Sequence, residues 1–203
     1  MRRLEPMDAL ILAAGQGSRM GGRKARLLLG GVPLVLAHVR RLRELGVERV
    51  HVVSASPDVE WIAREVKVTA SDAPDPAGSL AVGLRAIRLS LGARTPLLVV
   101  PVDSLPVSRD VLASLARALG TDRDAATPTF GDRGGHPILV RASALARYET
   151  ESPPLHDVLR ELGGQRVRVP VAEADVVVDL DTVDDVLRIT GSAARFLEDD
   201  TTH

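Results

Sequence analysis

Short apolar runs alternate with stretches of helical periodicity along the first half of this chain. The apolar runs that we interpret as strands are 9–14, 49–54, 67–70 and 95–102. The stretches between and after them that we interpret as helices are 33–45, 57–66, 79–91 and 109–119, with Ser108 as the N-cap and Gly120 as the stop of the last. Such alternation indicates βαβ units around a parallel sheet covered on both faces.

The pattern changes after residue 120. The segments 125–130 and 137–141 flank a glycine-rich turn at 131–135 and are predicted to pair as a small hairpin. A helix at 154–162, strands at 165–171 and 175–178, and a helix at 182–190 are predicted to follow, the last begun by Asp181 or Thr182 as its cap. We therefore predict a three-layer α/β/α, Rossmann-like fold with a mostly parallel sheet. One domain is expected over 1–203, with a core at 8–190 and a polar tail at 191–203.

Composition narrows the classes of function. The net charge is −1, so nothing global indicates a nucleic acid or an anionic membrane as partner. The absence of cysteine excludes thiol catalysis and thiolate metal sites. The longest uncharged run, 27–39, is too short to span a bilayer, and we expect a cytoplasmic protein.

The first apolar run ends in a turn rich in glycine and followed by cations. Glycines let backbone N–H groups approach phosphate oxygens, because no Cβ blocks them. The turn has Gly15 and Gly17, and the cations that would bond the same oxygens are Arg19, Arg23, Lys24 and Arg26. The pattern predicts a site for a nucleoside triphosphate. The plain alternative is a surface loop with solvated arginines.

Two better-known phosphate motifs fit this turn poorly. Gly17 and Gly22 have the spacing of a P-loop, but Lys24 comes one place late and no hydroxyl follows it. A dinucleotide fingerprint would need glycine where Met20 stands and a helix directly afterwards.

Carboxylates follow two of the predicted strands. Asp103 ends the buried-looking strand at 95–102, where ligands of open α/β sheets bind. Asp179 and Asp181 share one face if their segment is extended. Mg²⁺ prefers such oxygen ligands, and one or two carboxylates plus phosphate suffice. The alternative roles are a turn for Asp103 and a helix cap for Asp181.

The glycine turn resembles the opening motif of the molybdenum-cofactor nucleotidyltransferases, which are MobA-like NTP transferases of the nucleotide-diphospho-sugar transferase superfamily. The matching residues are Leu12, Ala13, Ala14, Gly15, Arg19, Met20, Gly21, Lys24 and the leucines at 27–29. Asp103, the acidic segment 179–185 and Gly135-His136-Pro137 also resemble family segments. Ala14 and the Gly-His-Pro segment are more similar to the cytidylyl branch than to the guanylyl branch.

The resemblance implies a Mg²⁺-dependent transfer of a nucleoside monophosphate to a phosphate-bearing acceptor similar to molybdopterin, with release of pyrophosphate. CTP is the favoured donor and GTP the alternative. It implies a molybdoenzyme or its chaperone as protein partner, and no nucleic acid or membrane. The implied catalytic residues are Arg19, Lys24 and Asp103, the acceptor lies beside His136, and the metal ligands are Asp103 and Asp179, with Asp181 less favoured. The implied nucleotide-binding residues are Leu12, Ala13, Ala14, Gly15, Gln16, Gly17, Arg19, Lys24, Ser54, Ser71, Gly78 and Asp103.

Three other functions remain open on the sequence. A sugar-1-phosphate nucleotidyltransferase would share the glycine turn. A nucleotide-binding regulator would have lost catalysis, although Lys24 and Asp103 are both present. A doubly wound hydrolase would use Asp103 as nucleophile, but such enzymes have their acidic motif after the first strand, where this chain has Gly15 and Arg19.

Overall fold

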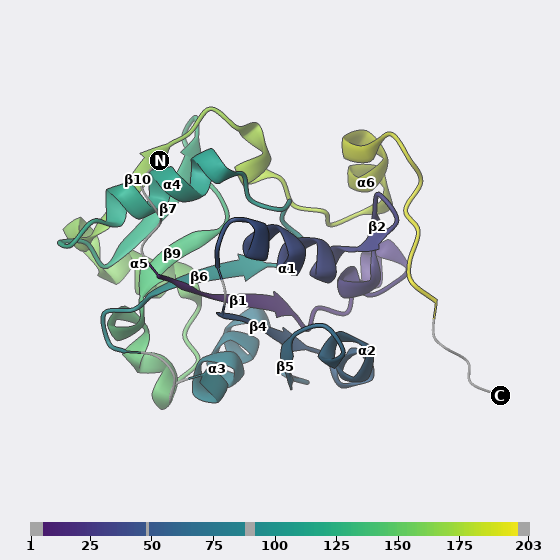
Figure 1. Ribbon diagram of the computed structural model, residues 1–203, viewed down its shortest axis with the longest axis horizontal. Coiled ribbons are helices and arrows are strands. Elements are labelled where there is room, and N and C mark those ends of the chain that lie inside the picture. The colour runs from purple at the N-terminus through teal and green to yellow at the C-terminus, as the bar shows by residue number, and fades with distance from the viewer. Residues whose placement is uncertain (1–5, 48, 88–91, 199–203) are drawn as a thin grey trace.

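The apolar runs form one mixed sheet in the computed structural model, which describes residues 6–47, 49–87 and 92–198 (Figure 1). The strand order is β10-β7-β9-β6-β1-β4-β5. The strands are β1 Asp8–Ala13, β4 Arg49–Ser54, β5 Lys67–Ala70, β6 Pro96–Pro101, β7 Ala125–Phe130, β9 Ile138–Arg141 and β10 Arg166–Pro170, with β8 Arg133–Gly134 paired to the end of β7. Only β9 runs against both of its long neighbours, so the sheet is mostly parallel, as predicted.

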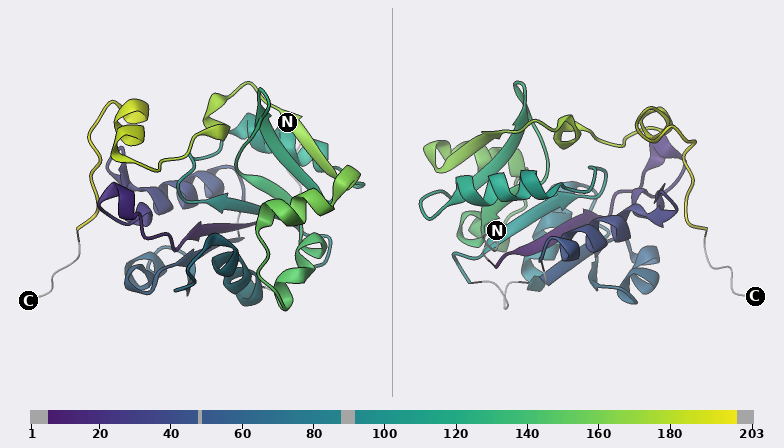
Figure 2. Two further views of the ribbon diagram at one scale, coloured as in Figure 1. Left: turned by 180° about the vertical axis from the view of Figure 1, so that it is seen from behind. Right: turned by 45° about the horizontal axis from the view of Figure 1, so that its top comes forward.

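Helices cover both faces of this sheet. The helices are α1 Leu34–Glu44, α2 Val59–Ala63, α3 Pro76–Ile87, α4 Arg109–Leu119, α5 Leu155–Glu161 and α6 Val183–Thr190. One apolar cluster joins α1, α2 and α4 to the sheet, and a second joins α3 and α5 to its other face. Figure 2 shows the sheet between these two layers. The predicted three-layer architecture is confirmed.

The central strand β1 shows why a continuous apolar run indicates a buried strand. Ala9, Ile11 and Ala13 face the first cluster, whereas Leu10 faces the second. Successive side chains point to opposite faces of a strand, so a strand covered on both sides must be apolar throughout.

The observed caps of α4 and α6 agree with the predicted ones. The Ser108 side chain accepts a hydrogen bond from the Val111 amide, and Gly120 ends α4. Thr182 caps α6 and forms a reciprocal capping box with Asp185. Because Thr182 takes the cap, the Asp181 carboxylate is left for another role.

The helix α3 begins three residues earlier than predicted. It starts at Pro76, and the Asp75 carboxylate accepts a hydrogen bond of 2.7 Å from the Gly78 amide, as a capping side chain does. Gly78 therefore lies in the first helical turn rather than in the preceding loop. The predicted end of this helix, Leu91, lies outside the described residues.

The predicted strand at 175–178 is wrong. The chain forms a 3-10 turn there, at Ala174–Val177. The physical reason is its contact with the glycine-rich hairpin: the Val176 carbonyl accepts a hydrogen bond of 2.7 Å from the His136 amide, and a Cβ on Gly135 would lie 2.1 Å from that carbonyl oxygen. The turn thus packs directly on the backbone of Gly135.

We expect Gly135→Ala to lower the free energy of unfolding by about 1–3 kcal/mol, because its methyl group must push away the Val176 carbonyl. Urea unfolding measures this change. Gly164→Ala is the matched control, since nothing lies within 4 Å of a Cβ there. Equal effects of the two substitutions would contradict the packing argument.

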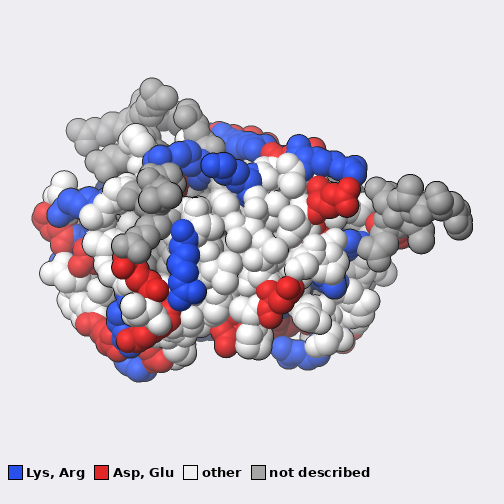
Figure 3. Space-filling view, turned by 90° about the horizontal axis from the view of Figure 1, so that it is seen from below, with Lys and Arg blue, Asp and Glu red and all other residues white. Residues whose placement is uncertain are grey.

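Surface charge is mixed on the face seen in Figure 3, where acidic and basic side chains intersperse. Within the described ranges, no helix combines the length and apolar character that crossing a membrane would require.

Candidate nucleotide-binding site

A cavity of about 1030 Å³ opens at the carboxyl ends of β1 and β6. Its position matches the rule that ligands of open α/β sheets bind beyond the carboxyl ends of the strands. The predicted site residues that line it are Leu12, Ala14, Gly15, Gln16, Gly17, Arg19, Lys24, Asp103, His136, Asp179 and Asp181. The structure therefore brings together residues from four distant parts of the sequence.

The Lys24 ammonium group joins the two acidic segments of this cavity. Its Nζ lies 2.7 Å from Asp103 Oδ2 and 2.5 Å from Asp181 Oδ1. Burial alone lowers the pKa of Lys24, but the bonds to these two carboxylates together outweigh it, so the pKa is raised. Lys24 is therefore a fixed positive charge on the wall of the cavity.

Backbone contacts hold the two acidic segments beside one another. The Leu180 amide donates a hydrogen bond of 2.8 Å to the Asp103 carbonyl, and Ser104 forms an antiparallel bridge with Asp179. The segment 179–181 is thus extended next to the loop after β6, as the alternation of its aspartates predicts.

A buried histidine supports the backbone around Asp103. His38 of α1 places its Nε2 3.2 Å from the Val102 carbonyl and 3.0 Å from the Ser104 carbonyl. Burial lowers the pKa of His38 to about 4, so its ring is neutral at pH 7 and Nε2–H can donate. No sequence signal identified this contact.

Negative charge is concentrated around Asp179. Burial and the nearby carboxylates Asp103 and Asp181 raise the pKa of Asp179, although His136 and Lys24 oppose the shift. The pKa of His136 is itself lowered by burial, and its Nδ1 is buried without a hydrogen-bond partner among the described residues.

No group of three or more metal-ligating His, Cys, Asp or Glu side chains occurs in the described part of the chain.

Only two of the four predicted phosphate-binding cations face the cavity. Arg19 is exposed on its wall, and Lys24 lies beside Asp103. Arg23 and Arg26 instead turn away and pair with the buried Asp58. The prediction that the four cations bond the same phosphate oxygens is therefore wrong for Arg23 and Arg26, because both pair with the buried Asp58.

Four predicted nucleotide-binding residues lie outside the cavity lining. Ala13 and Ser54 are 1% and 0% exposed, in the core at the ends of β1 and β4. The Ser71 hydroxyl lies behind Ser79, to which it donates a hydrogen bond of 3.4 Å. Gly78 is in the first turn of α3, between the lining residues Ala77 and Ser79.

The cavity also has polar residues that the sequence analysis did not single out. Asp72 and Asp75 line it after β5, and Ser56 Oγ donates a hydrogen bond of 2.8 Å to Asp72. On the opposite side Arg166 Nε donates a hydrogen bond of 3.1 Å to Thr127 Oγ1. The alternation along β10 was the signal that could have identified Arg166. Nothing in the sequence distinguished Asp72 from an ordinary loop aspartate.

Comparisons with known proteins agree on one group. The model of the MobA-like NTP transferase domain matches residues 9–169. A molybdenum cofactor guanylyltransferase from Pseudomonas aeruginosa is 36% identical over 118 residues, and the chain spans 58% of that relative's length. A nucleotidyl transferase from Methanothermobacter has a TM-score of 0.72 at 24% identity, with 92% of this chain and 97% of the other covered. The bifunctional IspDF of Campylobacter jejuni gives 0.74 at 19% identity, over 90% and 53% of the two chains.

Proposed function

Because this chain belongs to the family of MobA-like NTP transferase domains, we propose that it transfers a nucleoside monophosphate from a nucleoside triphosphate to a phosphate-bearing acceptor. The observation that carries the proposal is the position of Lys24, held by Asp103 and Asp181 beside the glycine turn. The expected acceptor is similar to molybdopterin, in line with the name of the Pseudomonas relative.

The reaction is an in-line displacement at the α-phosphorus. An oxygen of the acceptor phosphate forms a new bond to that phosphorus, the bond to the bridging oxygen breaks, and pyrophosphate leaves with the electron pair. Such transfer depends on positioning and on neutralising charge. Backbone N–H groups of Gly15 to Gly17 and the Arg19 side chain would hold the β- and γ-phosphates. Lys24 would offset the charge that grows at the α-phosphate.

The residues around Lys24 also fit a divalent cation. Burial, together with the nearby carboxylates Asp103 and Asp181, raises the pKa of Asp179, and among the described residues Lys24 is the one ammonium group that pairs with Asp103 and Asp181. We propose Asp103 and Asp179 as the Mg²⁺ ligands, with Asp181 as the less favoured one. When bound, Mg²⁺ would neutralise charge on the triphosphate and on the acceptor phosphate.

The acceptor is expected on the side of His136. A second hollow, of about 780 Å³, adjoins the main cavity and shares Asp179 and Asp181 with it. It lies between the β7–β8 hairpin and α6, and the half-exposed Phe130 is on its wall. Its position supports an acceptor whose phosphate lies near Asp179 while the rest of the molecule extends outward.

Pyrophosphate release with Mg²⁺ and each of the four triphosphates tests the proposal. A molybdopterin-type acceptor and a sugar 1-phosphate should be compared, because the sugar-1-phosphate nucleotidyltransferase is the competing activity. We expect release only with the former. Release with the sugar phosphate alone would replace the proposed acceptor, and triphosphate binding without any release would favour a regulator.

The nucleotide base is the subject of a separate prediction. Ala14 and Gly135-His136-Pro137 resemble the cytidylyl branch, whereas the name of the curated relative favours GTP. We expect CTP with Mg²⁺ to raise the melting temperature more than GTP does. A ligand at 100 times its dissociation constant stabilises by about 2.7 kcal/mol, which corresponds to several degrees in a domain of this size.

Thermal shift with CTP, GTP, UTP and ATP measures this preference. A clear shift with GTP and none with CTP would contradict the prediction and place the chain in the guanylyl branch. Lys24→Ala is the matched control, because a shift that depends on the phosphate site should shrink in that variant for whichever triphosphate binds.

A further inference from the structure

The turn that carries Lys24 is held on its inner side by a buried carboxylate. Asp58, at the end of the 3-10 turn Ser56–Asp58 after β4, has 0% exposure. Its Oδ1 accepts hydrogen bonds from Arg26 Nε and, at 3.2 Å, from Trp61 Nε1, and its Oδ2 lies 3.5 Å from Arg23 Nη1. The two arginines flank Lys24 in the sequence, so one carboxylate fixes the backbone on both sides of that lysine.

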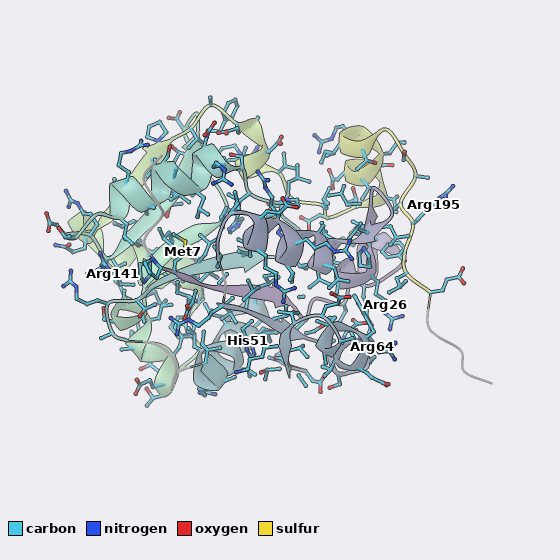
Figure 4. All side chains as sticks on the ribbon, in the orientation of Figure 1. Met7, Arg26, His51, Arg64, Arg141 and Arg195 are labelled. Atoms are coloured by element: carbon cyan, nitrogen blue, oxygen red, sulfur yellow. The ribbon has the colours of Figure 1, made fainter. Side chains whose placement is uncertain are left out.

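The outer side of the same turn is covered by the C-terminal segment 195–197. The Arg195 carbonyl accepts a hydrogen bond of 2.7 Å from the Leu28 amide, and the Leu197 amide donates one of 2.8 Å to the Arg26 carbonyl. The Phe196 ring covers Gly22, where a Cβ would lie 2.7 Å from Phe196 Cδ1. Figure 4 shows Arg26 and Arg195 at the same end of the molecule.

A buried carboxylate is costly unless it is paired and hydrogen-bonded. The pairing here spans more than thirty residues of sequence and connects a loop, α2 and the turn of Lys24. Asp58 does not line the cavity, and its three partners leave it no direct part in binding a ligand.

We propose that Asp58 is a positioning residue, which fixes the turn of residues 22–28 and thereby sets the place of the Lys24 ammonium group beside Asp103 and Asp181. It acts through Arg23 and Arg26, whose guanidinium groups serve the fold rather than the phosphate. The consequence for transfer rests on the proposed function, whereas the consequence for the position of Lys24 does not.

The chain has two lysines, which allows an internal comparison. The Lys24 side chain is 14% exposed and held by two carboxylates, whereas Lys67 on β5 is exposed. Limited acylation with an N-hydroxysuccinimide ester, read by peptide mass spectrometry, gives the labelling ratio of Lys24 to Lys67 in one sample. In Asp58→Asn this ratio should rise at least about fivefold, because the turn opens locally.

The matched control removes another buried aspartate that pairs with an arginine. Asp8 is 4% exposed and its Oδ1 accepts a hydrogen bond of 2.7 Å from Arg49 Nε, at the opposite ends of β1 and β4 from the cavity. Asp8→Asn should leave the labelling ratio within about twofold of the natural protein, because Asp8 is distant from the turn of Lys24 and shares no partner with it among the described residues. The same ratio in both variants would overturn the proposal.

A second variant keeps the test decisive if Asp58→Asn does not fold. Trp61→Phe retains the carboxylate and removes only the indole N–H that bonds it. It should raise the labelling ratio of Lys24 to Lys67 above that of the natural protein, by less than the roughly fivefold rise expected for a folded Asp58→Asn. An unchanged ratio in folded Trp61→Phe, together with an unfolded Asp58→Asn, would overturn the proposal.

Transfer kinetics separate this inference from the proposed function. Asp58→Asn should lower kcat about tenfold or more, with a smaller change in KM. In a Lys24→Ala background the same substitution should lower kcat little further, because Asp58 acts on transfer through the position of Lys24. Increased labelling of Lys24 without a loss of kcat would contradict the catalytic role of Lys24 and leave the positioning role of Asp58 intact.

Discussion

Lys24→Ala should lower the rate of nucleotidyl transfer on the order of 10²-fold or more, because it removes a preorganised positive charge from the phosphate site. The fold should survive, since the side chain contributes no apolar packing to either core cluster. Steady-state kinetics and circular dichroism measure the two effects.

Lys67→Ala is the matched control for this substitution, because it removes the other lysine, which is exposed on β5. It should leave turnover within a factor of about three of the natural protein. Turnover of Lys24→Ala in that same range would make Lys24 a surface lysine and contradict the proposed phosphate site.

Asp103→Asn should also cost on the order of 10²-fold in transfer, because it keeps the shape of the side chain and removes the charge proposed to hold Mg²⁺. Raising the Mg²⁺ concentration should recover part of the activity. Triphosphate binding without metal should change little or improve, since a negative charge near the phosphates is lost. A Mg²⁺ titration of the initial rate and metal-free binding measure these effects.

Asp110→Asn serves as its control, because that aspartate is exposed in the first turn of α4, away from the cavity. It should leave the Mg²⁺ dependence unchanged. If Asp103→Asn keeps the natural activity at low Mg²⁺, Asp103 is not a metal ligand, and its bond to Lys24 would be its whole contribution.

The layers of the fold could be predicted because their signals are local. Continuous apolar runs belong to strands covered on both faces, as in β1 and β6, and Ser108 and Gly120 mark the ends of α4 by the chemistry of their own side chains. The segment at 174–177 also has three valines nearby and yet forms a 3-10 turn. What decides its conformation is contact with Gly135, which is far away in sequence.

The candidate site could be predicted only where the type and position of a single residue indicate its role. The glycine turn and Asp103 could be identified by type and position, and both reach the cavity. The division of four neighbouring cations into two that face the cavity and two that pair with Asp58 could not be predicted. Arg23 and Lys24 carry the same charge in adjacent positions, and only the place of a buried carboxylate tells them apart.

The hydrogen bonds between the segment 195–197 and the turn of Lys24 have a consequence for the order of protein synthesis. Translation makes the turn before it makes the segment 195–197, which supplies the outer hydrogen bonds of the turn. The hydrogen bonds on the outer side of the turn therefore cannot form until Leu197 has been translated. A nascent chain released before that point would keep the glycine turn and Lys24 but lack the segment that covers Gly22 and bonds Arg26 and Leu28.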